Sequence, residues 1–141
     1  MNQYERAMAG KLFDPRSPEL TEKKRRAHKL CREFNALEED DPRRLPLMRQ
    51  LLGKLGEHAY FMGDLHFNYG CNTRIGDSFC ANYNLMVLDD GPVTIGDHVF
   101  LGPNVSPMVT PPQTMTPQAI QTWLPILMPG ANSDIETWPS G

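Results

Sequence analysis

Apolar side chains in the first third of the chain recur at the spacing of an α-helix. Residues 18–35 place them on one stripe of a 3.6-residue period, and its members are Leu20, Ala27, Leu30, Cys31 and Phe34. Ser17 before Pro18 is a favourable start, because serine caps free backbone N–H groups and proline fits the first helical position. We therefore predict a helix over 18–35. A second helix is predicted over 45–54, with Pro46 in its first turn.

From about residue 58 the pattern changes to short apolar runs separated by Gly, Asn and Asp. Residues 75–84 resemble residues 95–104, with four of ten positions identical. An apolar side chain recurs every six positions in this region, which is typical of a hexapeptide β-helix whose triangular coils each contain three such units. The inward positions predicted from this period are Ile75, Ala81, Val87, Val93, Val99 and Val105.

The two similar stretches are offset by twenty residues, whereas three six-residue units account for eighteen. We therefore predict a two-residue excursion, placed at 89–91. The predicted fold class is mainly β: a parallel β-helix of hexapeptide repeats, truncated to barely two coils, behind a small α-helical segment. Because the apolar face of a coil is covered only by its neighbours, several coils must stack for stability.

Residues 106–141 break the six-residue period. They hold seven of the thirteen prolines and both tryptophans, and their only charged residues are Asp134 and Glu136. The prolines exclude a long helix or a central strand. The chain thus divides into a helical segment 1–57, coils over 58–105, and an aberrant Pro-rich tail over 106–141. The tail is interpreted as disordered or as the product of a shifted reading frame.

Charge is distributed unevenly around a net value of −3: residues 1–57 carry +3 and residues 58–141 carry −6. The basic run 23–26 is flanked at helical spacings by glutamates, so we interpret it as a solvated helix face rather than a site for an anionic partner. No run approaches the ~18 apolar residues that cross a bilayer, and no secretory segment opens the chain. We expect a cytoplasmic protein with no nucleic acid and no membrane as partner.

Several short motifs occur in a defined order. Residues 4–14 read Tyr-Glu-Arg-Ala-Met-Ala-Gly-Lys-Leu-Phe-Asp, residues 33–35 read Glu-Phe-Asn, and Ile-Gly-Asp boxes lie at 75–77 and 95–97. Between and after these boxes lie Ala81-Asn82-Tyr83-Asn84, Leu88-Asp89-Asp90 and Gly102-Pro103-Asn104-Val105. This series resembles the maltose and galactoside (nodulation-type) O-acetyltransferase family, and the resemblance covers residues 4–105.

The resemblance implies a left-handed β-helix and a homotrimer with active sites between neighbouring subunits. It also implies transfer of acetyl from acetyl-CoA to a sugar acceptor such as maltose, glucose or a galactoside. This chemistry needs a base for the hydroxyl and a donor for the developing oxyanion. The family's base is a histidine whose position, by ungapped extension, falls on Pro112, and no histidine follows His98. No catalytic base is therefore retained, and the chain is predicted to be an inactive or impaired acetyltransferase.

Other site positions survive in the resemblance. Asn82 corresponds to the asparagine beside the catalytic histidine, and Asp90 to an acid that binds the acceptor. Asn68, Asp14 and Lys24 lie at or near further acceptor-contact positions. From residue chemistry alone, Asn82 fits a coil turn and Asp90 fits a cap on the excursion. The resemblance outweighs those readings for Asn82 and Asp90, but not for the other three.

Two other function classes stay open. The first alternative is a non-catalytic sugar-binding or assembly module on a β-helix scaffold, and the second is a hexapeptide N-acyltransferase with a different base. A zinc site, known in other hexapeptide folds, needs three protein ligands. His66 and His98 lack a suitably placed third histidine, so no metal is expected. Acetyl-CoA turnover with a sugar separates the acetyltransferase from the binding module.

Overall fold

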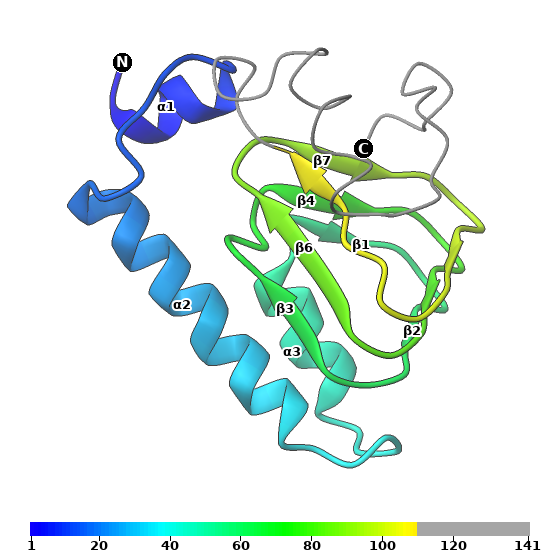
Figure 1. The fold of residues 1–141 in the computed structure, drawn as a ribbon. Coiled ribbons are helices and arrows are strands. Elements are labelled where there is room, and N and C mark those ends of the chain that lie inside the picture. Colours follow the sequence, from blue (N-terminus) through cyan, green and yellow to red (C-terminus); the bar gives the residue numbers. More distant parts are fainter. Residues whose placement is uncertain (110–141) are drawn as a thin grey trace.

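The computed structural model describes residues 1–109 of the 141-residue chain. Within this part, three helices lead into a series of short strands: α1 (Gln3–Met8), α2 (Pro18–Asn35) and α3 (Arg44–Leu51) (Figure 1). The strands are β1 (Lys54–Leu55), β2 (Tyr60–Phe61), β3 (Leu65–Phe67), β4 (Thr73–Ile75), β5 (Cys80–Ala81), β6 (Leu85–Asp89), β7 (Val93–Ile95), β8 (Phe100–Leu101) and β9 (Met108–Val109). The described residues contain no helix long and apolar enough to cross a membrane.

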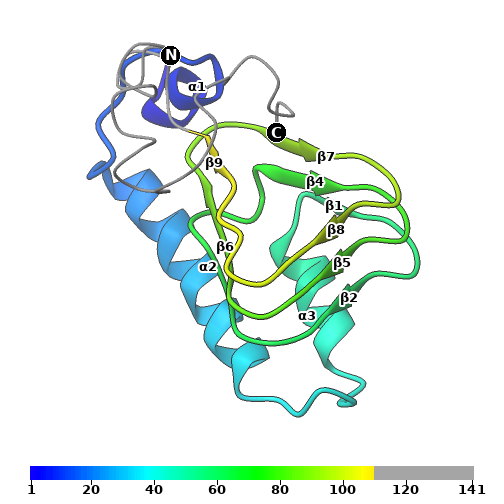
Figure 2. The same ribbon diagram turned by 45° about the vertical axis from the view of Figure 1, so that its right-hand side comes forward.

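The strands form three parallel sheets, and the chain visits the sheets in rotation. The strand orders are β1-β4-β7, β2-β5-β8 and β3-β6-β9, and Figure 2 shows the successive turns of chain stacked on one another. The register is constant: Lys54 pairs with Arg74, Cys80 with Phe100 and Leu88 with Met108. Each partner is twenty residues further along, which confirms the predicted twenty-residue repeat and the parallel coils.

The corners between strands depend on unusual backbone conformations at repeating positions. Ser78 and His98, twenty residues apart, both have positive φ angles, 57° in each case. The same holds for Asn84 (61°) and Asn104 (60°), and asparagine tolerates this left-handed region better than most residues. At Gly76 the adjacent coils approach so closely that a Cβ would overlap the Asp97 side chain. The Gly, Asn and Asp punctuation of the sequence thus marks the corners.

Four of the six predicted inward positions are confirmed. Ile75, Ala81, Val87 and Val93 are all buried. Val99 and Val105, by contrast, are only partly buried. Both belong to the last described coil, formed by β7, β8 and β9, which has a neighbouring coil on one side only within residues 1–109. In the same coil, Val93 on β7 is fully buried.

The helical segment shares its hydrophobic core with the coils. One cluster of buried side chains includes Phe34 and Met48 from the helices together with Phe61 and Phe79 from the coils. The Phe34 and Phe61 rings meet edge to face with centroids 6.1 Å apart, a favourable aromatic geometry. The Asn35 side chain bonds both the N–H and the carbonyl of Leu65, at 2.9 Å each, and so joins the end of α2 to β3.

Some element boundaries differ from the sequence predictions. The helix over 18–35 is confirmed, with the Ser17 side chain accepting from the Leu20 N–H. The second helix begins at Arg44 but ends at Leu51, because the Gly53 N–H bonds the Thr73 carbonyl and the chain enters the first sheet. The coils therefore start at Lys54 and not at residue 58.

The helix α1 was missed, although Asn2 and Glu5 form a capping box at its start and that spacing is a recognised signal. The predicted end of the coils at residue 105 was also wrong. The chain continues in register, and Asp89 in β6 pairs with Val109 in β9. Pro112 and most of the predicted tail lie outside the described residues.

Candidate functional site

Two of the predicted acceptor contacts meet at one corner of the coils. Asn68 follows β3 and Asp90 follows β6, and these strands are neighbours in one sheet. The Asn68 amide nitrogen donates to Asp90 Oδ1 at 3.0 Å, and both residues are half-buried. Because parallel strands end at the same edge of their sheet, residues twenty-two positions apart in sequence form one polar pair.

Asp89, the residue before Asp90, is fully buried beneath this corner. Its carboxylate accepts hydrogen bonds from the N–H groups of Tyr69 and Gly70 and from the Thr73 hydroxyl, each at 2.8 Å. Burial raises the pKa of the Asp89 carboxyl, although the bonds from Tyr69 and Thr73 oppose that shift. Asp89 was not among the predicted site residues. Its only sequence signal is a second acid beside Asp90, at a strand end.

The same corner is joined to the N-terminal helix. The Asn72 side chain donates to the Asp89 carbonyl at 2.8 Å and accepts from the Tyr4 hydroxyl at 3.1 Å. Lys23 on α2 lies over the Tyr4 ring, 4.5 Å from its centroid, within the range of a cation–π contact. A relay of polar contacts therefore runs from α2 through α1 to Asp89.

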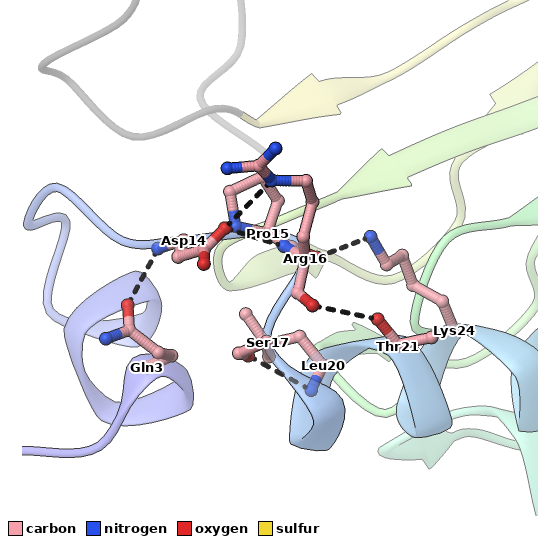
Figure 3. Close-up of polar contacts among 8 residues, drawn as sticks. All are labelled: Gln3, Asp14, Pro15, Arg16, Ser17, Leu20, Thr21 and Lys24. Carbon is pink, nitrogen blue, oxygen red and sulfur yellow. Dashed lines mark hydrogen bonds and ion pairs between the residues drawn. The ribbon is translucent and has the colours of Figure 1, made fainter.

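Asp14, on the connection between α1 and α2, and Lys24, in the second turn of α2, form a second group (Figure 3). Asp14 Oδ1 accepts from the Arg16 N–H at 3.0 Å, and Lys24 Nζ donates to the Pro15 carbonyl at 2.9 Å. The backbone bond from Arg16 is the main reason why the pKa of Asp14 lies below its usual value. No hydrogen bond joins this group to Asn68 or Asp90 in the described part of the chain.

A shallow hollow of about 430 Å³ lies beside Lys24 on the outer side of α2. It is lined by Pro15, Arg16, Thr21, Lys24, Arg25, His28 and Arg32. The hollow includes part of the basic run 23–26, which we interpreted from the sequence as a solvated helix face. Arg25 is paired there with Glu22 at 3.2 Å.

Asn82 lies at the end of β5, in a different sheet from Asn68 and Asp90. Its side-chain oxygen accepts from the adjacent Tyr83 N–H at 2.8 Å, and its own N–H donates to the Leu101 carbonyl at 2.9 Å. Within one chain the structure therefore separates Asn82 from the Asn68–Asp90 pair.

The histidines of the coils are exposed. His66 lies on β3 beside Met86, and His98 occupies a corner. No group of three His, Cys, Asp or Glu residues arranged to hold a metal ion occurs among residues 1–109.

Comparison with known proteins assigns this architecture to a family. Residues 6–56 match the maltose acetyltransferase hexapeptide capping motif. The galactoside O-acetyltransferase of Escherichia coli K12 is 40% identical over 111 residues, covering 78% of this chain and 55% of that protein. The chain thus spans about half the length of the curated relative that it matches.

Solved structures agree with the sequence match. A maltose O-acetyltransferase from Clostridium difficile 630 superposes with a TM-score of 0.73 at 34% identity, over 75% of this chain and 57% of that one. A galactoside acetyltransferase in complex with coenzyme A gives a TM-score of 0.72 at 40% identity, over 77% and 55%.

Three parallel sheets with a constant twenty-residue register, behind a matched capping motif, define the class as the hexapeptide-repeat acetyltransferases. Within that class the chain is similar to the maltose and galactoside O-acetyltransferases. The resemblance noted from the motifs of residues 4–105 is confirmed.

Proposed function

We propose that this protein acts in the acetyl-CoA-dependent O-acetylation of a sugar, with Asn68 and Asp90 as contacts for the acceptor. The observation that carries the proposal is the 3.0 Å bond between these side chains, in a chain related to galactoside and maltose O-acetyltransferases. Neither Asp90 Oδ2 nor Asn68 Oδ1 makes a hydrogen bond within residues 1–109. With respect to the described residues, both oxygens are therefore available to accept from sugar hydroxyls.

The position of Asn82 supports a site shared between subunits. Asn82 ends a strand of one sheet, whereas Asn68 and Asp90 end strands of another. A homotrimer of left-handed β-helices would bring Asn82 of one subunit to the Asn68–Asp90 pair of the next. Asp14 and Lys24 would then border the acceptor from the N-terminal segment. Size-exclusion chromatography with light scattering tests this assembly, and a monomer at micromolar concentration would contradict it.

The described residues account for the acceptor side of the reaction only. Acetyl-CoA would supply the acetyl group, and attack on its thioester requires a base near the sugar hydroxyl. The chain holds histidines at 28, 58, 66 and 98 only, and none of these is hydrogen-bonded to Asn82 or Asp90. We therefore propose that residues 1–141 alone bind the acceptor but transfer acetyl poorly.

A chimera tests this function directly. Residues 1–105 would be joined to the part of the Escherichia coli galactoside O-acetyltransferase that follows the matched region. We expect acetyl-CoA turnover with maltose or a galactoside, measured as free thiol, and a strong loss for Asp90→Asn, which replaces an acceptor-only group by one that also donates. Asp64→Asn, an exposed carboxylate with no hydrogen bond among the described residues, is the matched control and should retain turnover.

The alternative is a non-catalytic sugar-binding module. In such a module the same Asp90 and Asn68 oxygens would accept hydrogen bonds from the bound sugar. Sugar binding by residues 1–141 combined with a folded but inactive chimera would favour this alternative. Absence of both binding and turnover would exclude both proposals.

A further inference from the structure

Asp89 places a carboxylate where the fold leaves it no contact with solvent. Its side chain is 0% exposed, and an unpaired charge in that environment would be strongly destabilising. The buried carboxylate is stabilised by three donors from residues 69–73, and a fourth donor from the same residues bonds the backbone carbonyl of Asp89. All four donors therefore come from residues 69–73, which lead from β3 into β4 in the preceding coil and are called the 69–73 excursion below.

The geometry connects this buried group to both members of the acceptor pair. Asn68 is the residue before Tyr69, whose N–H is bound by Asp89 Oδ1, and Asp90 is the residue after Asp89. The Asn68–Asp90 bond above and the Tyr69–Asp89 bond below thus close a ring between the two coils. At Gly70, where φ is +70°, a Cβ would overlap Leu51, so the excursion has little freedom to rearrange.

We propose that Asp89 is the positioning residue of the acceptor corner: it holds the 69–73 excursion so that the Asn68 amide stays aligned with Asp90. Asp89 itself does not touch the acceptor. The test by sugar affinity rests on the proposed function. The test by the alignment of Asn68 does not, because that alignment is a property of the protein without a ligand.

The first test compares Asp89→Asn with Thr73→Val in the full 141-residue chain. Asparagine keeps the shape but turns an NH2 group toward N–H and O–H donors, so it releases the Tyr69 side of the excursion. Valine removes one donor to Oδ2 and leaves the Tyr69 and Gly70 bonds. We expect the Asn68 side-chain amide resonances to move in Asp89→Asn in the direction seen in Asp90→Asn, and to stay in place in Thr73→Val. Unmoved Asn68 resonances in a folded Asp89→Asn would overturn the proposal.

The second readout is affinity for maltose or a galactoside. Asp89→Asn should weaken it about tenfold, equivalent to ~1.4 kcal/mol, because a misaligned Asn68 loses its contact with the acceptor, whereas Thr73→Val should leave it unchanged despite lower stability. Equal weakening in both variants would show that Asp89 only stabilises the fold and would overturn the proposal. If the wild type binds neither sugar, the proposed function fails, and the Asn68 resonances still decide the role of Asp89.

A measurement on the wild type covers the case in which Asp89→Asn does not fold. The Tyr69 and Gly70 amides are bound by a buried carboxylate, so they should exchange with solvent as slowly as the ladder amides of β6. Exchange at the rate of exposed loop amides would show that Asp89 does not hold the excursion, and would overturn the proposal.

Discussion

The pKa of the partly buried Asp41 carboxyl is set by a neighbour two residues along the chain. Asp41 accepts from the Arg43 backbone at 2.9 Å and pairs with its guanidinium at 2.7 Å. These contacts, the side-chain bond first, lower the pKa of Asp41 to about 2. The pKa of Asp89 is shifted in the opposite direction, because burial raises it. The side-chain hydrogen bonds that oppose this shift come from Tyr69, Gly70 and Thr73, in the preceding coil.

The Asp41 carboxyl should therefore titrate near pH 2 in NMR spectra of the native protein. A lowered native pKa means that the unfolded state binds the proton more readily, so this pair stabilises the fold above about pH 4, the unfolded value, and the contribution disappears as the pH falls toward 2. Arg43→Gln should return the Asp41 pKa toward its ordinary value. A titration midpoint near 4 in the wild type would contradict the pairing.

At the scale of elements, the stacking of coils limits the side chains at the corners. Gly76 and Gly96 occupy the same turn in successive coils, but their surroundings differ. A Cβ at Gly76 would overlap Asp97, whereas one at Gly96 meets nothing within 4 Å among the described residues. The same Ile-Gly-Asp motif therefore tolerates different substitutions in the two coils.

We predict that Gly76→Ala destabilises the protein by about 1–3 kcal/mol, the usual cost of overpacking, while Gly96→Ala has a small effect. Thermal unfolding followed by circular dichroism measures both. The pair is a matched control, since the same methyl group is added at equivalent turns. Equal changes in Tm for the two variants would argue against close contact between the coils at Gly76.

The helical segment is an element that cannot complete its own core. Phe34 packs on Phe61, and Asn35 is bonded to Leu65. A fragment of residues 1–57 loses these partners and is too small to bury an adequate core, so it should be largely unfolded. The full 141-residue chain is the control, and it should unfold cooperatively. A cooperative thermal transition in the fragment would show an independent domain.

At the scale of the whole molecule, the proposed reaction would require groups from separate places. Within one chain Asn82 is apart from Asn68 and Asp90, and a positioned base contributes roughly 10²–10⁴-fold to rate. We predict no acetyl transfer above the buffer rate from purified residues 1–141 with acetyl-CoA and maltose or a galactoside. Robust turnover would mean that another residue supplies the base, and His66→Ala and His98→Ala variants would identify it.

Local periodicity was enough to establish the architecture. The stripe from Leu20 to Phe34 predicted α2 with its correct ends, because helix capping and amphipathicity depend on residues a few positions apart. The twenty-residue offset of the similar stretches agrees with the register of all three sheets, since identical turn motifs stack on one another. The end of α3 was missed because the Gly53 bond to Thr73 is a long-range contact.

For the candidate site, too, some features could be predicted from the sequence and others only from the tertiary structure. The sequence, through the family resemblance that its motifs carry, was enough to suggest Asn68, Asn82 and Asp90 as site candidates. Only the tertiary structure decided that Asn68 and Asp90 meet, that Asn82 does not join them within one chain, and that Asp89 is buried beneath the pair. The physical reason is distance along the chain: a hydrogen bond between coils depends on strand register and on the path of each excursion, and neither is encoded in the neighbours of a single residue.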